Sequence, residues 1–161
     1  MRVGILGMAG RMGRLLAEES TAAGHQVVGG TIGATAPAPV GASPTMSLRH
    51  LATLADVVID FTHASTITTH AKALATAGKA SVVGTSGLSA EDEAALATAA
   101  ARIPVVYAAN FGLGINLLLS VAERLGAALP PETYDAEIVE LHHRQKVDAP
   151  SGSAIALGQA V

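Results

Sequence analysis

The fold is decided by residues 3–13, which read Val3-Gly4-Ile5-Leu6-Gly7-Met8-Ala9-Gly10-Arg11-Met12-Gly13. A short apolar run bounded by glycine is typical of a buried parallel strand. Residues 14–23 follow with the apolar spacing of a packed helix, so the order is strand, glycine turn, helix. Such a turn lets the backbone approach a pyrophosphate, whose charge is stabilised by the unpaired amides and the positive dipole at the start of the helix.

The spacing of these glycines is GxxGxxG, whereas the common dinucleotide-binding fingerprint is GxGxxG. Taken alone, a glycine turn between a strand and a helix is as easily a purely structural turn as a phosphate-binding one. Its place at the start of an alternating chain favours phosphate binding. Arg11 is either a solvated residue of the first helical turn or a partner for a phosphate oxygen.

Strand and helix patterns continue to alternate along the chain. Apolar runs predict four further strands, at residues 26–30, 57–59, 81–83 and 105–107. Helical patterns are expected at residues 46–54, at 65–77 and from Ser89 onward, with a loop rich in Pro, Ala and Gly at 36–45. This alternation predicts an α/β fold in which a Rossmann-like parallel sheet carries helices on both faces.

Small or polar residues follow the later strands. The segments are Asp60-Phe61-Thr62-His63, Gly84-Thr85-Ser86-Gly87 and Ala108-Ala109-Asn110-Phe111-Gly112. Ordinary turn chemistry explains each segment singly, but ligands of an open parallel sheet bind at the carboxyl ends of its strands, so the series favours a cofactor crevice. Phe61 fits core packing as well as a wall for a nicotinamide ring. His63 fits a surface residue better than a ligand.

The end of the second strand lacks the residues that usually select the cofactor. A dinucleotide fold carries an acid there for the adenosine ribose, or a basic residue for a 2'-phosphate. This chain has Thr31-Ile32-Gly33-Ala34-Thr35 and therefore offers neither. The preference between NADH and NADPH stays open.

The composition sets wide limits on function. The chain has 161 residues, 50% of them hydrophobic, and a formal net charge of -3, which gives no basic surface for nucleic acid or an anionic membrane. Cysteine is absent, which excludes disulfides, thiolate catalysis and Cys-based zinc sites. No apolar segment reaches the roughly 18 residues of a membrane span, and the N-terminal apolar run is too short for a signal peptide. We therefore expect a soluble cytoplasmic protein with no nucleic-acid or membrane partner.

A second domain is expected to begin near Gly112, which gives a dinucleotide-binding domain over residues 1–111 and a further segment over 112–161. The second segment is expected to contain an apolar helix over 115–125, a strand over 136–141 and a helix that starts near Ser153. These elements make only the beginning of an α+β substrate and oligomerisation domain, because one strand and parts of two helices do not easily close a core.

Polar chemistry gathers in a loop over residues 140–153. His142 and His143 are adjacent at a predicted strand end, where successive side chains point to opposite faces, so different roles are expected. Histidine exchanges protons near neutral pH, and Lys146 supplies a positive charge or an acid. Ser151-Gly152-Ser153 before a helix is a predicted anion site. This set suits a substrate with carboxylates and a reaction that needs a proton.

Parts of this loop also have other interpretations. Asp148 and Pro150 are better explained as the start of a helix than as functional groups. A zinc site from Glu140 and the two histidines is disfavoured, because adjacent histidines at a strand end diverge and neither an HExxH pattern nor any cysteine supports it. No metal is therefore expected.

Together these segments resemble the 4-hydroxy-tetrahydrodipicolinate reductase family, also called dihydrodipicolinate reductase, of the diaminopimelate and lysine pathway. The resemblance spans nearly all 161 residues in the same order, and its last segment is the most specific. The matching segments are Gly7-Met8-Ala9-Gly10-Arg11-Met12-Gly13, Ile59-Asp60-Phe61-Thr62, Gly84-Thr85-Ser86-Gly87, Ala109-Asn110-Phe111 and Glu140-Leu141-His142-His143-Arg144-Gln145-Lys146-Val147-Asp148-Ala149-Pro150-Ser151-Gly152-Ser153.

The resemblance implies a role for each segment. The pyrophosphate of NADPH or NADH would be held by Gly7, Met8, Ala9, Gly10, Arg11 and Met12. The nicotinamide side would be lined by Gly84, Thr85, Ser86, Ala108, Ala109, Asn110 and Phe111. The catalytic pair would be His142 and Lys146, which protonate a cyclic imine acid as it receives a hydride, and the sequence does not decide which residue delivers which proton. The carboxylates of this small dicarboxylate would be bound by His143, Gly152 and Ser153.

Family members are much longer than this chain. Their remaining strands build a substrate-binding and tetramerisation sheet, so the resemblance implies an incomplete second domain here and a homotetramer for the full-length protein. A reductase is the expected function, with weak or no turnover expected of these 161 residues alone. The alternative is a non-catalytic nicotinamide-nucleotide-binding module or an inactive fragment. The coding sequence beyond Val161 would help to separate the two.

Overall fold

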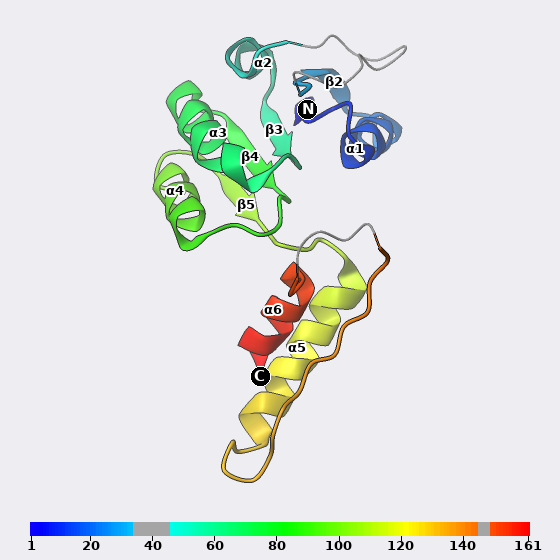
Figure 1. Cartoon of the computed structure of the whole chain (residues 1–161). Coiled ribbons are helices and arrows are strands. Elements are labelled where there is room, and N and C mark those ends of the chain that lie inside the picture. The colour runs from blue at the N-terminus through cyan, green and yellow to red at the C-terminus, as the bar shows by residue number, and fades with distance from the viewer. Residues whose placement is uncertain (34–45, 145–148) are drawn as a thin grey trace. The chain divides into compact units, whose positions relative to one another are not determined.

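The apolar runs of the sequence form a sheet of five parallel strands in the computed structural model (Figure 1). The strands are β1 (Arg2–Leu6), β2 (Gln26–Gly30), β3 (Val57–Asp60), β4 (Ala80–Val83) and β5 (Val105–Tyr107). Their order across the sheet is β2-β1-β3-β4-β5. Each strand lies within one residue of the range that the sequence predicts.

The structure describes residues 1–33, 46–144 and 149–161. These divide into two units, Met1–Ala108 and Ala109–Val161, and each is described here by itself. The loop predicted over residues 36–45 and the predicted catalytic residue Lys146 lie outside the described residues.

The carboxyl ends of four strands lie level with one another. Leu6 of β1 pairs with Asp60 of β3, Asp60 pairs with Val83 of β4, and Val83 pairs with Tyr107 of β5. The segments that leave these strands therefore start along one edge of the sheet. This is the edge at which open parallel sheets bind their ligands.

Helices cover both faces of the sheet, as the alternating pattern predicts. They are α1 (Arg11–Ala22), α2 (Leu48–Leu54), α3 (Ala64–Ala77) and α4 (Ala90–Ala100). Successive residues of a strand point to opposite faces. On one face Ile5 packs with Leu16 of α1, and on the other Leu6 packs in a cluster with Leu51 of α2 and Ile67 of α3.

Local sequence fixes where these helices begin and end. The Ser89 side chain accepts a hydrogen bond from the backbone of Asp92, and the Asp92 carboxylate accepts one from the backbone of Ser89, which makes a capping box at the start of α4. The hydrogen bonds from Ser89 hold the pKa of Asp92 below its ordinary value. Gly78, with a φ of 66°, ends α3 in the left-handed conformation that favours glycine.

The second unit contains the helices α5 (Leu113–Ala128) and α6 (Gly152–Ala160), which pack together. Both helices confirm the sequence prediction, and α5 is longer than expected at each end. The prediction of a strand over residues 136–141 is wrong, because these residues have no regular secondary structure. A strand needs a neighbour to pair its backbone groups, and the described part of this unit has no other strand.

An apolar stripe on α5 is exposed. Leu113, Leu117, Val121 and Leu125 follow one another at intervals of four residues, and more than half of each side chain is accessible. Residues at this spacing lie on one face of a helix. Among the described residues, no helix is both long enough and apolar enough to cross a membrane.

Candidate cofactor and substrate sites

The glycine loop between β1 and α1 is shaped by close backbone packing. Gly7 has a φ of 74° and its carbonyl oxygen accepts the Gly10 amide at 2.9 Å. A Cβ at Gly13 would overlap this same carbonyl and the backbone of Met8. Glycine at position 13 therefore lets the first turn of α1 approach the loop closely.

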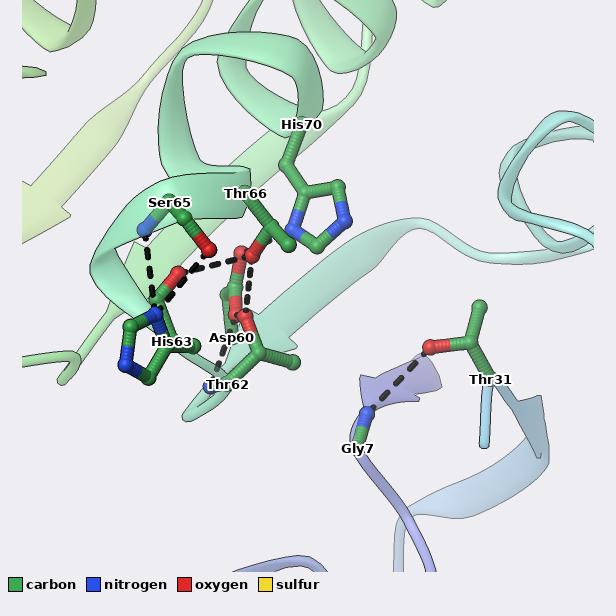
Figure 2. A network of polar contacts seen from close by, with 8 residues as sticks. All are labelled: Gly7, Thr31, Asp60, Thr62, His63, Ser65, Thr66 and His70. Atoms are coloured by element: carbon green, nitrogen blue, oxygen red, sulfur yellow. Dashed lines mark hydrogen bonds and ion pairs between the residues drawn. The ribbon is translucent and has the colours of Figure 1, made fainter. Parts of the chain in front are cut away.

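Thr31 holds the glycine loop from the end of β2 (Figure 2). Its hydroxyl accepts the Gly7 amide at 3.2 Å, and its carbonyl oxygen accepts the Met8 amide at 2.9 Å. The Thr31 amide in turn donates to the Ile5 carbonyl at 3.0 Å. In the sequence, the segment that begins at Thr31 is notable only because it lacks an acidic or basic residue. The support that Thr31 gives to the glycine loop is not predicted.

The start of α1 fits a phosphate group. Gly10 is the N-cap and has no side chain to accept a hydrogen bond from the helix. No hydrogen bond among the described residues uses the amides of Arg11, Met12 or Gly13. The first amides of a helix and its positive dipole end together favour an anion, and no acidic side chain lies in the first turn to compete for this place.

The segments after β3 and β4 interlock. A Cβ at Gly84 would overlap the ring of Phe61, so the ring lies directly against the Gly84 backbone. Thr85 is 4% exposed, and its hydroxyl has no hydrogen-bond partner among the described residues. Buried hydroxyls are normally hydrogen-bonded, so this one suits a site that receives a polar ligand group. Ser86 is exposed beside it.

A polar network surrounds the end of β3 (Figure 2). The Asp60 side chain accepts from Thr62 and lies 2.7 Å from Nδ1 of His70 on α3. His63 is exposed, as predicted, and its Nδ1 accepts the Ser65 amide at 3.3 Å at the start of α3. The sequence signals that would have found this network are an aspartate that ends a buried strand and a histidine on the following helix.

In the second unit, Asn110 shapes the start of α5. Its side-chain oxygen accepts the Gly112 amide at 2.6 Å, and its backbone oxygen accepts from the Asn116 side chain at 3.0 Å. The predicted cofactor residues Ala109 and Phe111 flank it, and both are exposed.

Glu140 joins the histidine segment to the start of α6. One carboxylate oxygen accepts the Ser151 amide at 2.8 Å, and the other lies 3.5 Å from Nδ1 of His142. The Ser151 hydroxyl accepts the Ala154 amide at 3.1 Å and caps α6, whose first residues are Gly152 and Ser153. Within the described residues, no three His, Asp or Glu side chains are grouped to hold a metal ion.

The comparisons with known proteins identify the family. Residues 1–111 match the family model described as "Dihydrodipicolinate reductase, N-terminus", and residues 114–161 match "Dihydrodipicolinate reductase, C-terminus". The chain belongs to the dihydrodipicolinate reductase family. The resemblance that the sequence motifs suggest is therefore confirmed.

Individual relatives show how much of this family's length the chain represents. It is 57% identical to the 4-hydroxy-tetrahydrodipicolinate reductases of Granulibacter bethesdensis and Gluconacetobacter diazotrophicus, over all of this chain and 62% of each relative. A solved dipicolinate-bound dihydrodipicolinate reductase from Paenisporosarcina sp. TG-14 superposes with a TM-score of 0.74 at 28% identity, covering 99% of this chain and 64% of that one. The chain thus spans about 62% of the length of the curated relatives it matches.

The two units divide the site residues predicted from the reductase motifs. The first unit carries Gly7, Met8, Ala9, Gly10, Arg11, Met12, Gly84, Thr85, Ser86 and Ala108, all of which follow β1, β4 or β5 at the carboxyl edge of the sheet. The second carries Ala109, Asn110, Phe111, His142, His143, Gly152 and Ser153. Glu140 links His142 to the start of α6, and both His142 and His143 are exposed.

Proposed function

We propose that this chain supplies the cofactor domain and the catalytic loop of a 4-hydroxy-tetrahydrodipicolinate reductase. The activity is the reduction of 4-hydroxy-tetrahydrodipicolinate to tetrahydrodipicolinate by NADPH or NADH, in diaminopimelate and lysine biosynthesis. The observation that carries the proposal is the glycine loop, which is fixed by Thr31 at the uncapped start of α1. The names of relatives that are 57% identical support the same reaction.

The first proposed domain, residues 1–111, binds the cofactor. The loop from Gly7 to Met12 holds the pyrophosphate, to which the unused amides of Arg11 and Met12 donate, and the Arg11 side chain adds a positive charge beside it. The segments Gly84–Ser86 and 108–111 line the nicotinamide, where the unpaired Thr85 hydroxyl offers a hydrogen bond. When it is bound, the reduced nicotinamide supplies a hydride.

The second proposed domain, residues 112–161, begins the substrate site. His142 and Lys146 supply the proton that the reduced cyclic acid needs. Glu140 keeps His142 close to the start of α6, at 3.5 Å between the carboxylate and Nδ1. His143, Gly152 and Ser153 bind the substrate carboxylates, with support from the amides at the N-terminus of α6.

We infer that the full-length protein is a homotetramer in the cytoplasm, where it draws on the reduced nicotinamide dinucleotide pool. The homotetramer rests on the family resemblance, and the exposed apolar stripe of α5 is a surface for the remaining strands of the second domain or for another copy to cover. Light scattering on the full-length protein tests this assignment. A monodisperse monomer would contradict it.

The reaction is tested by following NADPH and NADH absorbance with freshly made dihydrodipicolinate. We expect turnover by the full-length protein and a loss of about a hundredfold or more in kcat for His142→Ala and Lys146→Ala. Cofactor binding without turnover would favour a non-catalytic nucleotide-binding module. An unchanged rate in Lys146→Ala would contradict its catalytic role.

A further inference from the structure

The Asp60 carboxylate is buried and fully engaged by hydrogen bonds. Asp60 is 1% exposed. Its Oδ1 accepts the Thr62 amide at 3.0 Å and the Thr62 hydroxyl at 2.6 Å, and its Oδ2 lies 2.7 Å from Nδ1 of His70. A buried carboxylate is costly unless such donors compensate for its lost hydration, so each of these three contacts matters to the local structure.

His70 ties a helix to this strand end. It lies on α3, ten residues after Asp60, and its side chain is 17% exposed. An ionised carboxylate only accepts hydrogen bonds, so Nδ1 of His70 carries the hydrogen in this contact. The end of β3 is therefore joined to α3 by a partly buried hydrogen bond as well as by apolar packing.

The turn that Asp60 organises lies between two segments of the proposed cofactor site. The methyl carbon of Thr62 is 3.1 Å from the position that a Cβ of Gly7 would occupy. The ring of Phe61 fills the space beside Gly84, whose amide donates to the Asp60 carbonyl at 2.9 Å. A shift of the Phe61–Thr62 turn would therefore disturb the glycine loop and the Gly84 segment together.

We propose that His70, acting through Asp60, is a positioning residue for nicotinamide-dinucleotide binding. This inference rests on the proposed function, and it assigns to His70 no contact with the cofactor. Without the His70 N–H, the buried carboxylate lacks one of its donors and the turn between Gly7 and Gly84 is no longer held in place. The effect falls on cofactor affinity more than on the chemical step, because His142 belongs to the other unit.

Calorimetric titration of the full chain with NADPH and NADH tests the proposal. His70→Leu removes the donor, and we expect its Kd for the preferred cofactor to rise about tenfold. His70→Asn places an amide nitrogen where Nδ1 stands, so its Kd should stay within about threefold of the parent value. His50→Leu is the matched control, because His50 is exposed on the neighbouring helix α2 and its Kd should not change.

A second variant keeps the test decisive if His70→Leu does not fold. Thr62→Val removes the hydroxyl that donates to Asp60 at 2.6 Å but preserves the methyl group beside Gly7, and a similar loss of affinity is expected. In steady-state assays of the full-length protein, the KM for the cofactor should rise while kcat stays near the parent value. This split separates positioning of the cofactor from a general loss of structure.

Two results would overturn this inference and leave the proposed function standing. One is a parental Kd in folded His70→Leu or, where that variant does not fold, in Thr62→Val. The other is an equal loss of affinity in His70→Asn and His70→Leu, which would show that the hydrogen bond is not what matters. A parent chain that binds neither cofactor would instead overturn the proposed function, and this inference with it.

Discussion

Glu140 accepts the backbone amide of Ser151 at 2.8 Å, across the segment that carries the two histidines. Its other oxygen lies 3.5 Å from Nδ1 of His142. One carboxylate thus connects the proposed proton donor to the helix start proposed to bind the substrate carboxylates. Side chains that orient catalytic groups in this way commonly affect rate without touching the substrate.

Replacement of Glu140 should therefore reduce turnover. In Glu140→Ala both contacts are lost, and we expect kcat/KM of the full-length protein to fall about 10- to 100-fold in the dihydrodipicolinate assay. Glu140→Gln keeps an oxygen for the Ser151 amide but loses the charge near His142, so an intermediate loss is expected. Glu137→Ala is the control, because Glu137 is an exposed carboxylate three residues earlier in the same segment, and its kcat/KM should stay at the parent value. Parental kcat/KM in Glu140→Ala would contradict this role.

The packing of the glycine loop predicts that alanine at position 13 weakens cofactor binding more than alanine at position 10. A Cβ at Gly13 would overlap the Gly7 carbonyl and the Met8 backbone, whereas a Cβ at Gly10 would lie 3.2 Å from the Gly7 oxygen. Gly13→Ala must push α1 away from the loop, so we expect cofactor affinity to fall by about tenfold or more and stability by about 1–3 kcal/mol. Gly10→Ala should have a clearly smaller effect. Titration with NADPH and NADH checks the order, and equal losses in the two variants would contradict this account.

Much of the first unit could be predicted from sequence because its signals are local. A parallel strand reads as a short run rich in apolar residues, so the sequence predicts even the edge strands β2 and β5 at their observed ends. Ser89 marks the start of α4 through the chemistry of its own side chain. The order of strands and helices then leaves few alternatives to a doubly wound sheet.

Contacts between distant segments could not be predicted in the same way. Thr31 holds the glycine loop across 24 residues, and Glu140 reaches Ser151 across 11, yet neither pattern is visible in a local window. The strand expected over residues 136–141 failed for a related reason. Its apolar residues, two of them β-branched, suit a strand, but pairing depends on a neighbour that the described residues of this unit do not contain.

The ion pair between Arg2 and Asp56 predicts a dependence of stability on pH. The Arg2 guanidinium donates to Asp56 at 2.6 Å, and this hydrogen bond is the main reason that the pKa of Asp56 falls from 3.8 to about 2. A lowered pKa in the folded state stabilises the fold above the unfolded value of 3.8, and this contribution is lost as the pH falls through about 2.

Neutralising Asp56 should remove this part of the pH dependence. In Asp56→Asn, the difference in the free energy of unfolding between about pH 5 and about pH 2 should be smaller than in the parent. Urea unfolding at the two pH values measures it. Glu132→Gln is the control, since Glu132 is an exposed carboxylate in the other unit. The same pH dependence in Asp56→Asn and the parent would show that the exposed pair contributes nothing measurable, as is common for surface ion pairs.

The contact between Phe61 and Gly84 is best tested by a double-mutant cycle. Gly84→Ala adds a Cβ that overlaps the Phe61 ring, so we expect a loss of about 1–3 kcal/mol in stability together with weaker cofactor binding. Phe61→Leu reduces the side chain, so the combination with Gly84→Ala should lose less than the two single variants added together. Gly114→Ala in α5 is the control, because no atom lies within 4 Å of its Cβ position and alanine is the better helix former. Urea unfolding measures these losses in the free energy of unfolding. If the losses for Gly84→Ala and Phe61→Leu add strictly, the Phe61 ring moves aside at no cost and Gly84 is required for some other reason.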